Sequence, residues 1–190
     1  MKIKLDSRFR GNDITYLSFR AKTRNPEMTL KILYIKKILF WLFVTHIIYI
    51  LIIWFVNPPI TLTMVGSLLR GEGLKRDYIP IENMSRHARL SVIAAEDQLF
   101  PDHFGFDMKG IQAALEFNEN NTGKLRGGST ISQQVAKNVF LWQGRSYFRK
   151  GLEAYFTLWI ELLYSKKRIL ELYLNVAEMG KGVYGIEAAS

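Results

Sequence analysis

The hydrophobic positions divide the chain into one continuous apolar run and a longer part with helical spacing. Ile38 to Val56 is a run of nineteen residues without a formal charge. At about 1.5 Å per residue, a helix of this length spans roughly 28 Å, close to the thickness of the hydrocarbon core of a bilayer. The run is apolar on every face, which excludes an amphipathic surface helix, and Pro58 and Pro59 follow it. We therefore expect one membrane-spanning helix near the N-terminus.

A secretory signal peptide is the alternative to this retained anchor. Its apolar core would be shorter, and no small-residue cleavage pattern follows Val56. Three lysines adjoin the N-terminal end of the run, whereas the first basic residue beyond it is Arg70. The positive-inside rule then places the N-terminus in the cytoplasm and residues 60–190 on the outer side of the membrane.

The formal net charge of +9 is concentrated near the N-terminus. Residues 1–37 carry a net charge of +7 and residues 38–190 one of +2, so the main body offers no broad basic surface for nucleic acid. The chain has no cysteine, which excludes a disulfide framework and thiolate metal sites. Residues 1–27 show no periodicity and are expected to form a basic disordered arm, with Met28 as an alternative start. Residues 28–59 then form the anchor and residues 60–190 the exported domain.

The exported part is expected to be all-α. A short linker bearing Gly66, Gly71 and Gly73 precedes it, and the apolar spacing beyond is helical with few strand-like runs. Caps and stripes predict five helices. The first runs along Met84, Ala88, Val92 and Ala95, and the second is capped by Asp107 and runs to about Asn118. The third begins with a capping box of Thr130 and Gln133. The fourth runs from about Ser146 to Tyr164, and the fifth from Ser165 to about Asn175.

Acidic residues gather directly after an apolar run. The segment EDQLFPDHFGFD (residues 96–107) holds four acids and one histidine within twelve residues. A carboxylate at the end of a buried helix is partly desolvated, which makes it a better proton acceptor near neutral pH. A solvated turn rich in aspartate is the alternative. Glu96 is therefore an acid/base candidate.

A glycine-rich segment, RGGSTISQQ (residues 126–134), leads into the next helix. Paired glycines let the backbone approach a ligand closely, and a helix N-terminus presents unpaired N–H groups to an anion. Lys137, two turns further on, could add a point charge for phosphate. The Gly-Lys-Ser/Thr order of a Walker A loop is absent. The segment alone is a weak indication of an anion site.

Two charged groups occur further along the chain. Arg149 and Glu153 are four residues apart on one helix face, although most such pairs are surface ion pairs of little energetic worth. Residues 166–168 place three positive charges on the first turn of a helix, against its dipole, which indicates an anionic partner such as lipid headgroups. No HExxH pattern or Ser/His/Asp elbow is present.

Taken in order, these segments resemble the successive motifs of the peptidoglycan glycosyltransferases (glycosyltransferase family 51), which include the transglycosylase domains of bifunctional penicillin-binding proteins. The family pattern E-D-x-x-F-x-x-H-x-G-x-D fits residues 96–107, G-G-S-T-[IL]-[ST]-Q-Q-x-x-K-N fits residues 127–138, and R-K-x-x-E fits residues 149–153. The resemblance covers about residues 90–190. With one anchor and no room for a transpeptidase domain, the chain most resembles the monofunctional biosynthetic members.

The resemblance implies a lysozyme-like helical fold and an inverting enzyme of the bacterial cytoplasmic membrane. It would polymerise lipid II into glycan strands on the outer face and release undecaprenyl pyrophosphate. Glu96 would be the general base, and Glu153 would support the departing pyrophosphate, with a bound Mg²⁺ or Mn²⁺. The remaining motif positions would bind or shape the site for the substrate: Asp97, Phe100, His103, Thr130, Gln134, Lys137 and Arg149. The implied partners are lipid II, the nascent glycan strand, membrane lipids and other cell-wall synthesis or division proteins, with no nucleic acid.

Two alternatives remain open at this point. A lytic peptidoglycan hydrolase of lysozyme-like fold would cut glycan with one acidic glutamate and would not need Lys137 or Arg149, because its substrate has no pyrophosphate. A membrane-anchored inactive remnant is the other, since Ser190 lies within the family's G-x-E-A-A-x-x-Y-F segment and a C-terminally truncated domain is expected.

Overall fold

The computed structural model describes residues 26–121, 123, 126–144 and 146–190. Two compact units are distinguished, residues 1–49 and residues 50–190, and each is described by itself. The predicted basic arm of residues 1–27 lies outside the described residues except for Pro26 and Glu27, which already belong to a helix.

Helix α2 (Pro26–Phe55) contains the predicted apolar run and extends it toward the N-terminus. It begins with a proline, which suits the first helical position because the missing N–H would have no partner there. Residues 27–55 are long and apolar enough to cross a membrane. The polar side chains of the run bind the helix's own backbone, since Thr45 donates to the Trp41 carbonyl (2.8 Å) and His46 Nδ1 lies 2.7 Å from the Phe43 carbonyl.

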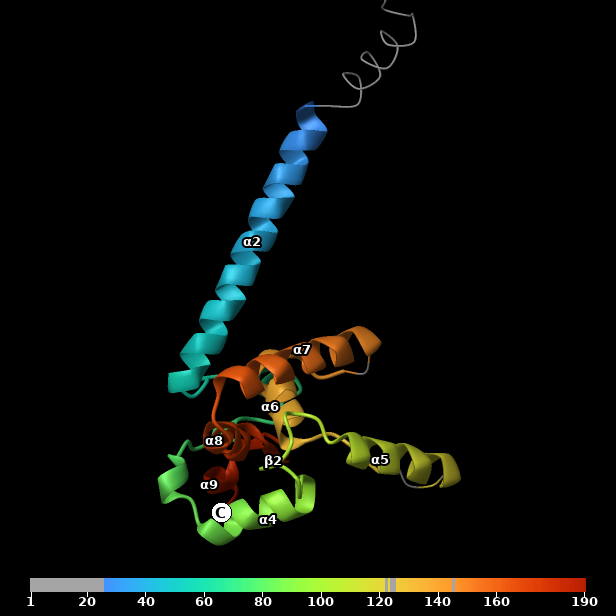
Figure 1. Ribbon diagram of the computed structural model, residues 1–190. Coiled ribbons are helices and arrows are strands. Elements are labelled where there is room, and N and C mark those ends of the chain that lie inside the picture. The colour runs from blue at the N-terminus through green and yellow to red at the C-terminus, as the bar shows by residue number, and fades with distance from the viewer. Residues whose placement is uncertain (1–25, 122, 124–125, 145) are drawn as a thin grey trace, which may run out of the picture. The chain divides into compact units, whose positions relative to one another are not determined.

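The second unit is mostly helical, as the sequence predicts (Figure 1). Its helices are α3 (Leu62–Leu69), the 3-10 turn η1 (Ile81–Asn83), α4 (Arg86–Glu96), α5 (Met108–Asn120), α6 (Ile131–Phe140), α7 (Tyr147–Leu163), α8 (Lys166–Val176) and α9 (Ile186–Ala189). Three short strands accompany them, β1 (Lys75–Arg76), β2 (Glu178–Gly180) and β3 (Val183–Tyr184). Strand β3 pairs parallel with β1 and antiparallel with β2.

Four helix starts were predicted correctly, three of them from capping signals and that of α7 from its apolar spacing. Each capping side chain accepts a hydrogen bond from a backbone N–H in the first turn, as an N-cap does. The four caps are Asp107 of α5, Thr130 of α6, Ser146 of α7 and Ser165 of α8. Thr130 also forms the predicted reciprocal capping box with Gln133.

Three predictions of local structure were wrong. The segment predicted as a linker contains α3, whose N-cap is Thr61 and which includes Gly66. Met84 belongs to the turn before α4 rather than to the helix. The small sheet was missed because strands of two or three residues are too short to show an alternating pattern.

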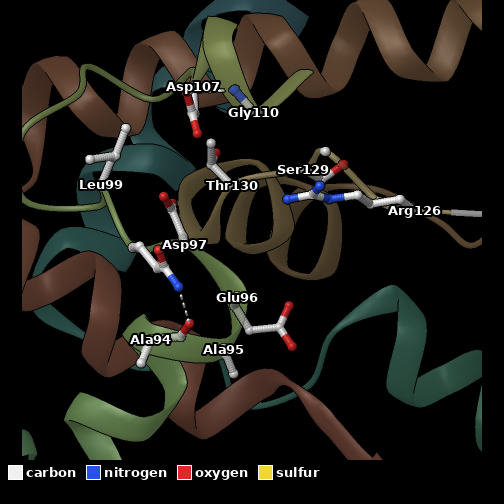
Figure 2. Close-up of a pocket in the computed structure, with 13 residues that line it drawn as sticks. Ala94, Ala95, Glu96, Asp97, Leu99, Asp107, Gly110, Arg126, Ser129 and Thr130 are labelled. Atoms are coloured by element: carbon white, nitrogen blue, oxygen red, sulfur yellow. Dashed lines mark hydrogen bonds between the residues drawn. The ribbon is translucent and has the colours of Figure 1, made fainter. Parts of the chain in front are cut away.

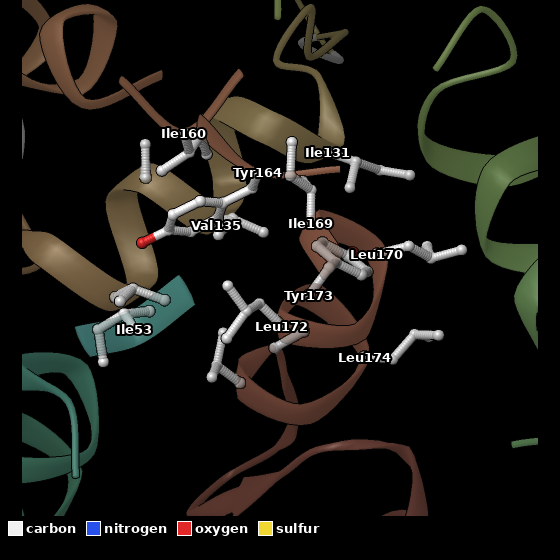
Figure 3. Close-up of a cluster of buried hydrophobic side chains, with 14 of the residues drawn as sticks. Ile53, Ile131, Val135, Ile160, Tyr164, Ile169, Leu170, Leu172, Tyr173 and Leu174 are labelled. Carbon is white, nitrogen blue, oxygen red and sulfur yellow. The ribbon is translucent and has the colours of Figure 1, made fainter. Parts of the chain in front are cut away.

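The core of this unit is centred on α6, which packs against both α7 and α8. Figure 3 shows the apolar side chains that meet there, among them Ile131, Val135, Ile160, Ile169 and Leu172, each of which is fully buried. Because α6 is enclosed on two sides, the position of its N-terminal turn is set by the core rather than by a surface loop.

The cations on the first turn of α8 have partners inside the unit. Lys166 pairs with Glu161, Lys167 with Glu82, and Arg168 with Glu171, while Arg168 also donates to the Ile53 carbonyl at the end of α2 (2.7 Å). Acids of the unit, Glu171 of α8 itself among them, therefore already compensate the charge of this turn, and an anionic partner such as lipid headgroups stays a prediction.

Tyr173, on α8, provides a test of the core. Burial, with the charge of Glu96 acting in the same direction, raises the pKa of its hydroxyl to about 12. The unfolded chain ionises this group near pH 10, so its contribution to stability is present below pH 10 and is lost between about pH 10 and 12. We expect Tyr173→Phe to lose less stability between pH 8 and pH 11 than the parent, measured by urea unfolding at both values. Tyr147→Phe, at a fully exposed position, is the control; equal losses in all three proteins would contradict the assignment.

Candidate active site

The end of α4 and the glycine-rich segment before α6 enclose a cleft of about 500 Å³ (Figure 2). Its walls come from three parts of the sequence, which include residues of the two motif segments 96–107 and 126–134. The lining residues are Ala94 to Leu99 from the α4 end, Asp107 and Gly110 from the start of α5, and Arg126 to Thr130 before α6.

Glu96 is the last residue of α4 and its carboxylate points away from Asp97 (Figure 2). Gln134 of α6 donates to its Oε2 atom at 2.8 Å. Glu96 is exposed, so the prediction that it is desolvated at the end of a buried helix was wrong. The reason is that none of the eleven residues of α4 is buried. A carboxylate with this exposure can receive a hydroxyl group of a ligand.

Asp97 is 6% exposed and its carboxylate is fully engaged, in contrast with its neighbour. It accepts from the backbone N–H of Ile131, the first residue of α6, at 2.9 Å. Both oxygens also lie 2.9 Å from His103 Nε2. A carboxylate at a helix N-terminus is stabilised by the unpaired N–H groups and the dipole. Asp97 therefore joins the end of α4 to the start of α6.

Phe100 and His103 support the cleft from behind, whereas Thr130 forms part of its wall. Phe100 is 2% exposed and belongs to the core, and His103 holds Asp97. Thr130 is buried and its hydroxyl donates to the Gly105 carbonyl at 2.7 Å. Contact with a substrate remains a prediction for each of these three residues.

The two glycines before α6 differ in their surroundings. A Cβ atom at Gly128 would lie 3.2 Å from the Cα of Ile111 and from the Cβ of Ala114, so this glycine lets the segment approach α5. A Cβ atom at Gly127 would meet nothing within 4 Å. Only Gly127 is therefore positioned as the sequence analysis expected, with its backbone open to a ligand.

A buried carboxylate and two cations form a cluster on α7. Glu153 is 3% exposed, accepts from Arg149 at 3.0 Å and from Lys150 at 2.5 Å, and lies on the side of α7 that faces α6. The alternative of a weak surface pair is excluded because Glu153 is removed from solvent. The sequence analysis missed Lys150, although its spacing of three residues from Glu153 was a usable signal.

The α7 cluster adjoins the cleft through the glycine-rich segment. Lys150 Nζ lies 3.4 Å from the Ser129 hydroxyl. A second, smaller hollow of about 220 Å³ is lined by Lys150 together with Arg126, Gly128 and Ser129, which also line the first cleft. Segment 126–129 therefore forms a common wall between the Glu96 side and the Lys150 side.

The charges of both Glu96 and Glu153 act on the ammonium group of Lys137. Burial lowers the pKa of its ammonium group, as do the charges of Arg149 and Lys150, whereas Glu153 and Glu96 act in the opposite direction. Both predicted carboxylates are therefore close enough to affect a single ammonium group on α6. The effect of both carboxylates on this half-buried lysine agrees with the wall that the two hollows share.

Among the described residues, no group of three or more histidine or acidic side chains could hold a metal ion. Glu153, the carboxylate that the predicted Mg²⁺ or Mn²⁺ would use, is already bound by two cations. Within the described part of the chain, the residues around Glu153 thus do not by themselves form a resident metal site, and a bound Mg²⁺ or Mn²⁺ stays a prediction.

Comparison with known proteins agrees with this arrangement. Residues 63–190 match the model of the transglycosylase family. A biosynthetic peptidoglycan transglycosylase of Pseudomonas putida (strain GB-1) is 52% identical over 162 residues, which cover 82% of this chain and 68% of the relative. One from Xanthomonas campestris pv. campestris (strain B100) is 50% identical over 151 residues, covering 76% and 61%. With a cleft lined by the first two motif segments, the α7 cluster of the third beside it, and a family match over residues 63–190, the chain belongs to the transglycosylase family.

Proposed function

We propose that the chain is a peptidoglycan glycosyltransferase that polymerises lipid II into glycan strands, with inversion at the donor sugar and release of undecaprenyl pyrophosphate. The names of its relatives support peptidoglycan as the polymer, and the motif resemblance supports lipid II as the substrate. The observation that carries the proposal is the shared wall of residues 126–129, which has Glu96 in the cleft on one side and Lys150 in the smaller hollow on the other.

Glu96 is the proposed general base. It accepts the proton of the 4-hydroxyl group of the acceptor sugar while that oxygen attacks the anomeric carbon of the donor. Gln134 holds one carboxylate oxygen at 2.8 Å, which orients the group and leaves the other oxygen available. A bond forms between the acceptor oxygen and the anomeric carbon, and the bond from that carbon to the pyrophosphate oxygen breaks.

The cations of the α7 cluster, together with Lys137 of α6, are proposed to stabilise the departing pyrophosphate. Negative charge develops on the leaving oxygen, and Lys137, Arg149 and Lys150 supply positive charge fixed by the fold. Glu153 holds Arg149 and Lys150 in place through short contacts, so this carboxylate acts by positioning the cations. A base on one side and cations on the other are what an inverting displacement requires.

A divalent cation is proposed here only as an ion that binds together with the pyrophosphate of the substrate. Mg²⁺ is often held by one carboxylate together with phosphate oxygens, so a pyrophosphate could bring the ion to the α7 cluster. Every step proposed above is carried by the chain's own residues.

Helix α2 is proposed to anchor the chain in the bacterial cytoplasmic membrane, with the N-terminus inside and the catalytic domain outside. Its length and its exposed apolar side chains support a membrane span. An anchor keeps the domain beside a substrate that stays in the bilayer. Membrane lipids, the nascent glycan strand and other cell-wall synthesis or division proteins are the proposed partners.

Incubation of the full chain with lipid II in detergent tests the function and separates it from the hydrolase alternative. A transferase produces lengthening glycan strands from lipid II and leaves preformed strands intact. A lytic hydrolase shortens preformed strands. An inactive remnant does neither, and either of the last two results would refute the proposal.

A further inference from the structure

The second glutamate of α7 is buried behind the site and takes no part in the proposed reaction. Glu161 is 8% exposed and lies two turns after Glu153 on the same inward-facing side of the helix. Its carboxylate accepts from the hydroxyl group of Ser132, in the first turn of α6, and from Lys166 at 2.8 Å. A buried carboxylate costs free energy unless it is paired and hydrogen-bonded, so the position of Lys166 is closely constrained.

Lys166 connects this carboxylate to the loop that follows Glu96. Its ammonium group donates to the His103 carbonyl at 2.6 Å and lies 4.7 Å from the centre of the Phe100 ring. Both contacts are with the loop between α4 and α5, residues 97–107. One side chain at the start of α8 therefore binds α7 and this loop together.

The same loop is attached to α6 at two further points. His103 holds Asp97, which accepts from the Ile131 N–H, and Thr130 donates to the Gly105 carbonyl. Gly105 has a φ angle of 80°, and a Cβ atom there would lie 2.9 Å from Cγ of Glu161. The loop thus packs directly on the buried carboxylate, with no room for a side chain between them.

We infer that Glu161 and Lys166 are positioning residues for the base, and that their ion pair fixes the loop so that Glu96 meets Gln134 in the cleft. This inference rests on the proposed function. Glu96 immediately precedes Asp97, the first attached residue of the loop, and Gln134 lies one turn after the attached start of α6. Release of the loop would move the base relative to its partner, and misplacement of a reacting group lowers the rate of the chemical step.

Lys166→Met removes the ammonium group and keeps most of the apolar stem. We expect kcat for lipid II polymerisation to fall by about tenfold or more, with KM within about twofold, at a temperature at which the variant is folded. Lys167→Met is the matched control, because Lys167 is the next residue of the same turn and pairs with the exposed Glu82. This control should keep the kcat of the parent.

A double variant separates positioning from stability. Glu161→Gln combined with Lys166→Met leaves no unpaired buried charge, so its unfolding temperature should recover relative to Lys166→Met. Its kcat should stay low, because methionine cannot donate to the His103 carbonyl. Recovery of kcat together with stability would overturn the inference.

Hydrogen exchange of the full chain gives a readout that does not depend on activity. Backbone amides of residues 97–106 should exchange faster in Lys166→Met than in Lys167→Met and the parent. Unchanged exchange in this loop would refute the role of Lys166. Failure of the parent to polymerise lipid II would instead refute the proposed function, and the exchange result would still stand by itself.

Discussion

Glu96→Gln is expected to reduce the rate of lipid II polymerisation by about 10²–10³-fold, since a positioned general base contributes an effect of this order. The substitution keeps the size of the side chain and removes its ability to accept a proton. Because Glu96 is exposed and its carboxylate accepts from the side-chain amide of Gln134, a contact that a glutamine can keep, the free energy of unfolding should change by less than about 0.5 kcal/mol. Initial rates of glycan synthesis and urea unfolding of the same preparations measure the two quantities.

Glu116→Gln is the matched control for this experiment. Glu116 is exposed on α5 and also accepts from a glutamine amide, that of Gln112 at 2.9 Å. The same chemical change in the same kind of contact, outside the site, should leave the rate within about twofold of the parent. A fully active Glu96→Gln protein would show that another group removes the proton.

Glu153→Gln is expected to affect both activity and stability. Loss of the buried charge leaves Arg149 and Lys150 without the carboxylate that holds them, so the rate should fall by about 10²-fold. The free energy of unfolding should fall by about 1–3 kcal/mol, since a partly buried ion pair is broken. Initial rates at saturating lipid II and urea unfolding again provide the two measurements.

Glu171→Gln separates these two effects. Glu171 pairs with Arg168 at 2.9 Å on α8, and its side chain is 17% exposed, so the variant also breaks an arginine–glutamate pair that is largely buried. It should lose stability to a similar extent and retain kcat. If both variants lose kcat in proportion to stability, the α7 cluster has no special role in the reaction.

Local sequence signals predicted most of the helices and identified the segments that line the candidate site. Side-chain caps such as Thr130 and Ser146 depend on residues three positions away, so the sequence contains all that is needed to recognise them. The sheet was not predictable in this way, because β1 and β3 pair across more than a hundred residues and neither strand has an alternating pattern of its own.

The roles of individual charges depended on contacts that are distant in sequence. Glu96 and Asp97 are adjacent and chemically alike, yet one is exposed and the other is fixed against the start of α6. The cations of α8 suggested an external anion, whereas the structure places Glu82 and Glu161 beside them. Periodicity shows which residues share a helix face, but it does not show which other element covers that face.

A crystal structure of the chain with a bound lipid II analogue would test the central claim most directly. The account predicts that the pyrophosphate lies within hydrogen-bond distance of at least two of Lys137, Arg149 and Lys150, and that sugar hydroxyl groups reach the carboxylate of Glu96. A pyrophosphate bound elsewhere on the domain, with the 500 Å³ cleft filled only by solvent, would contradict it.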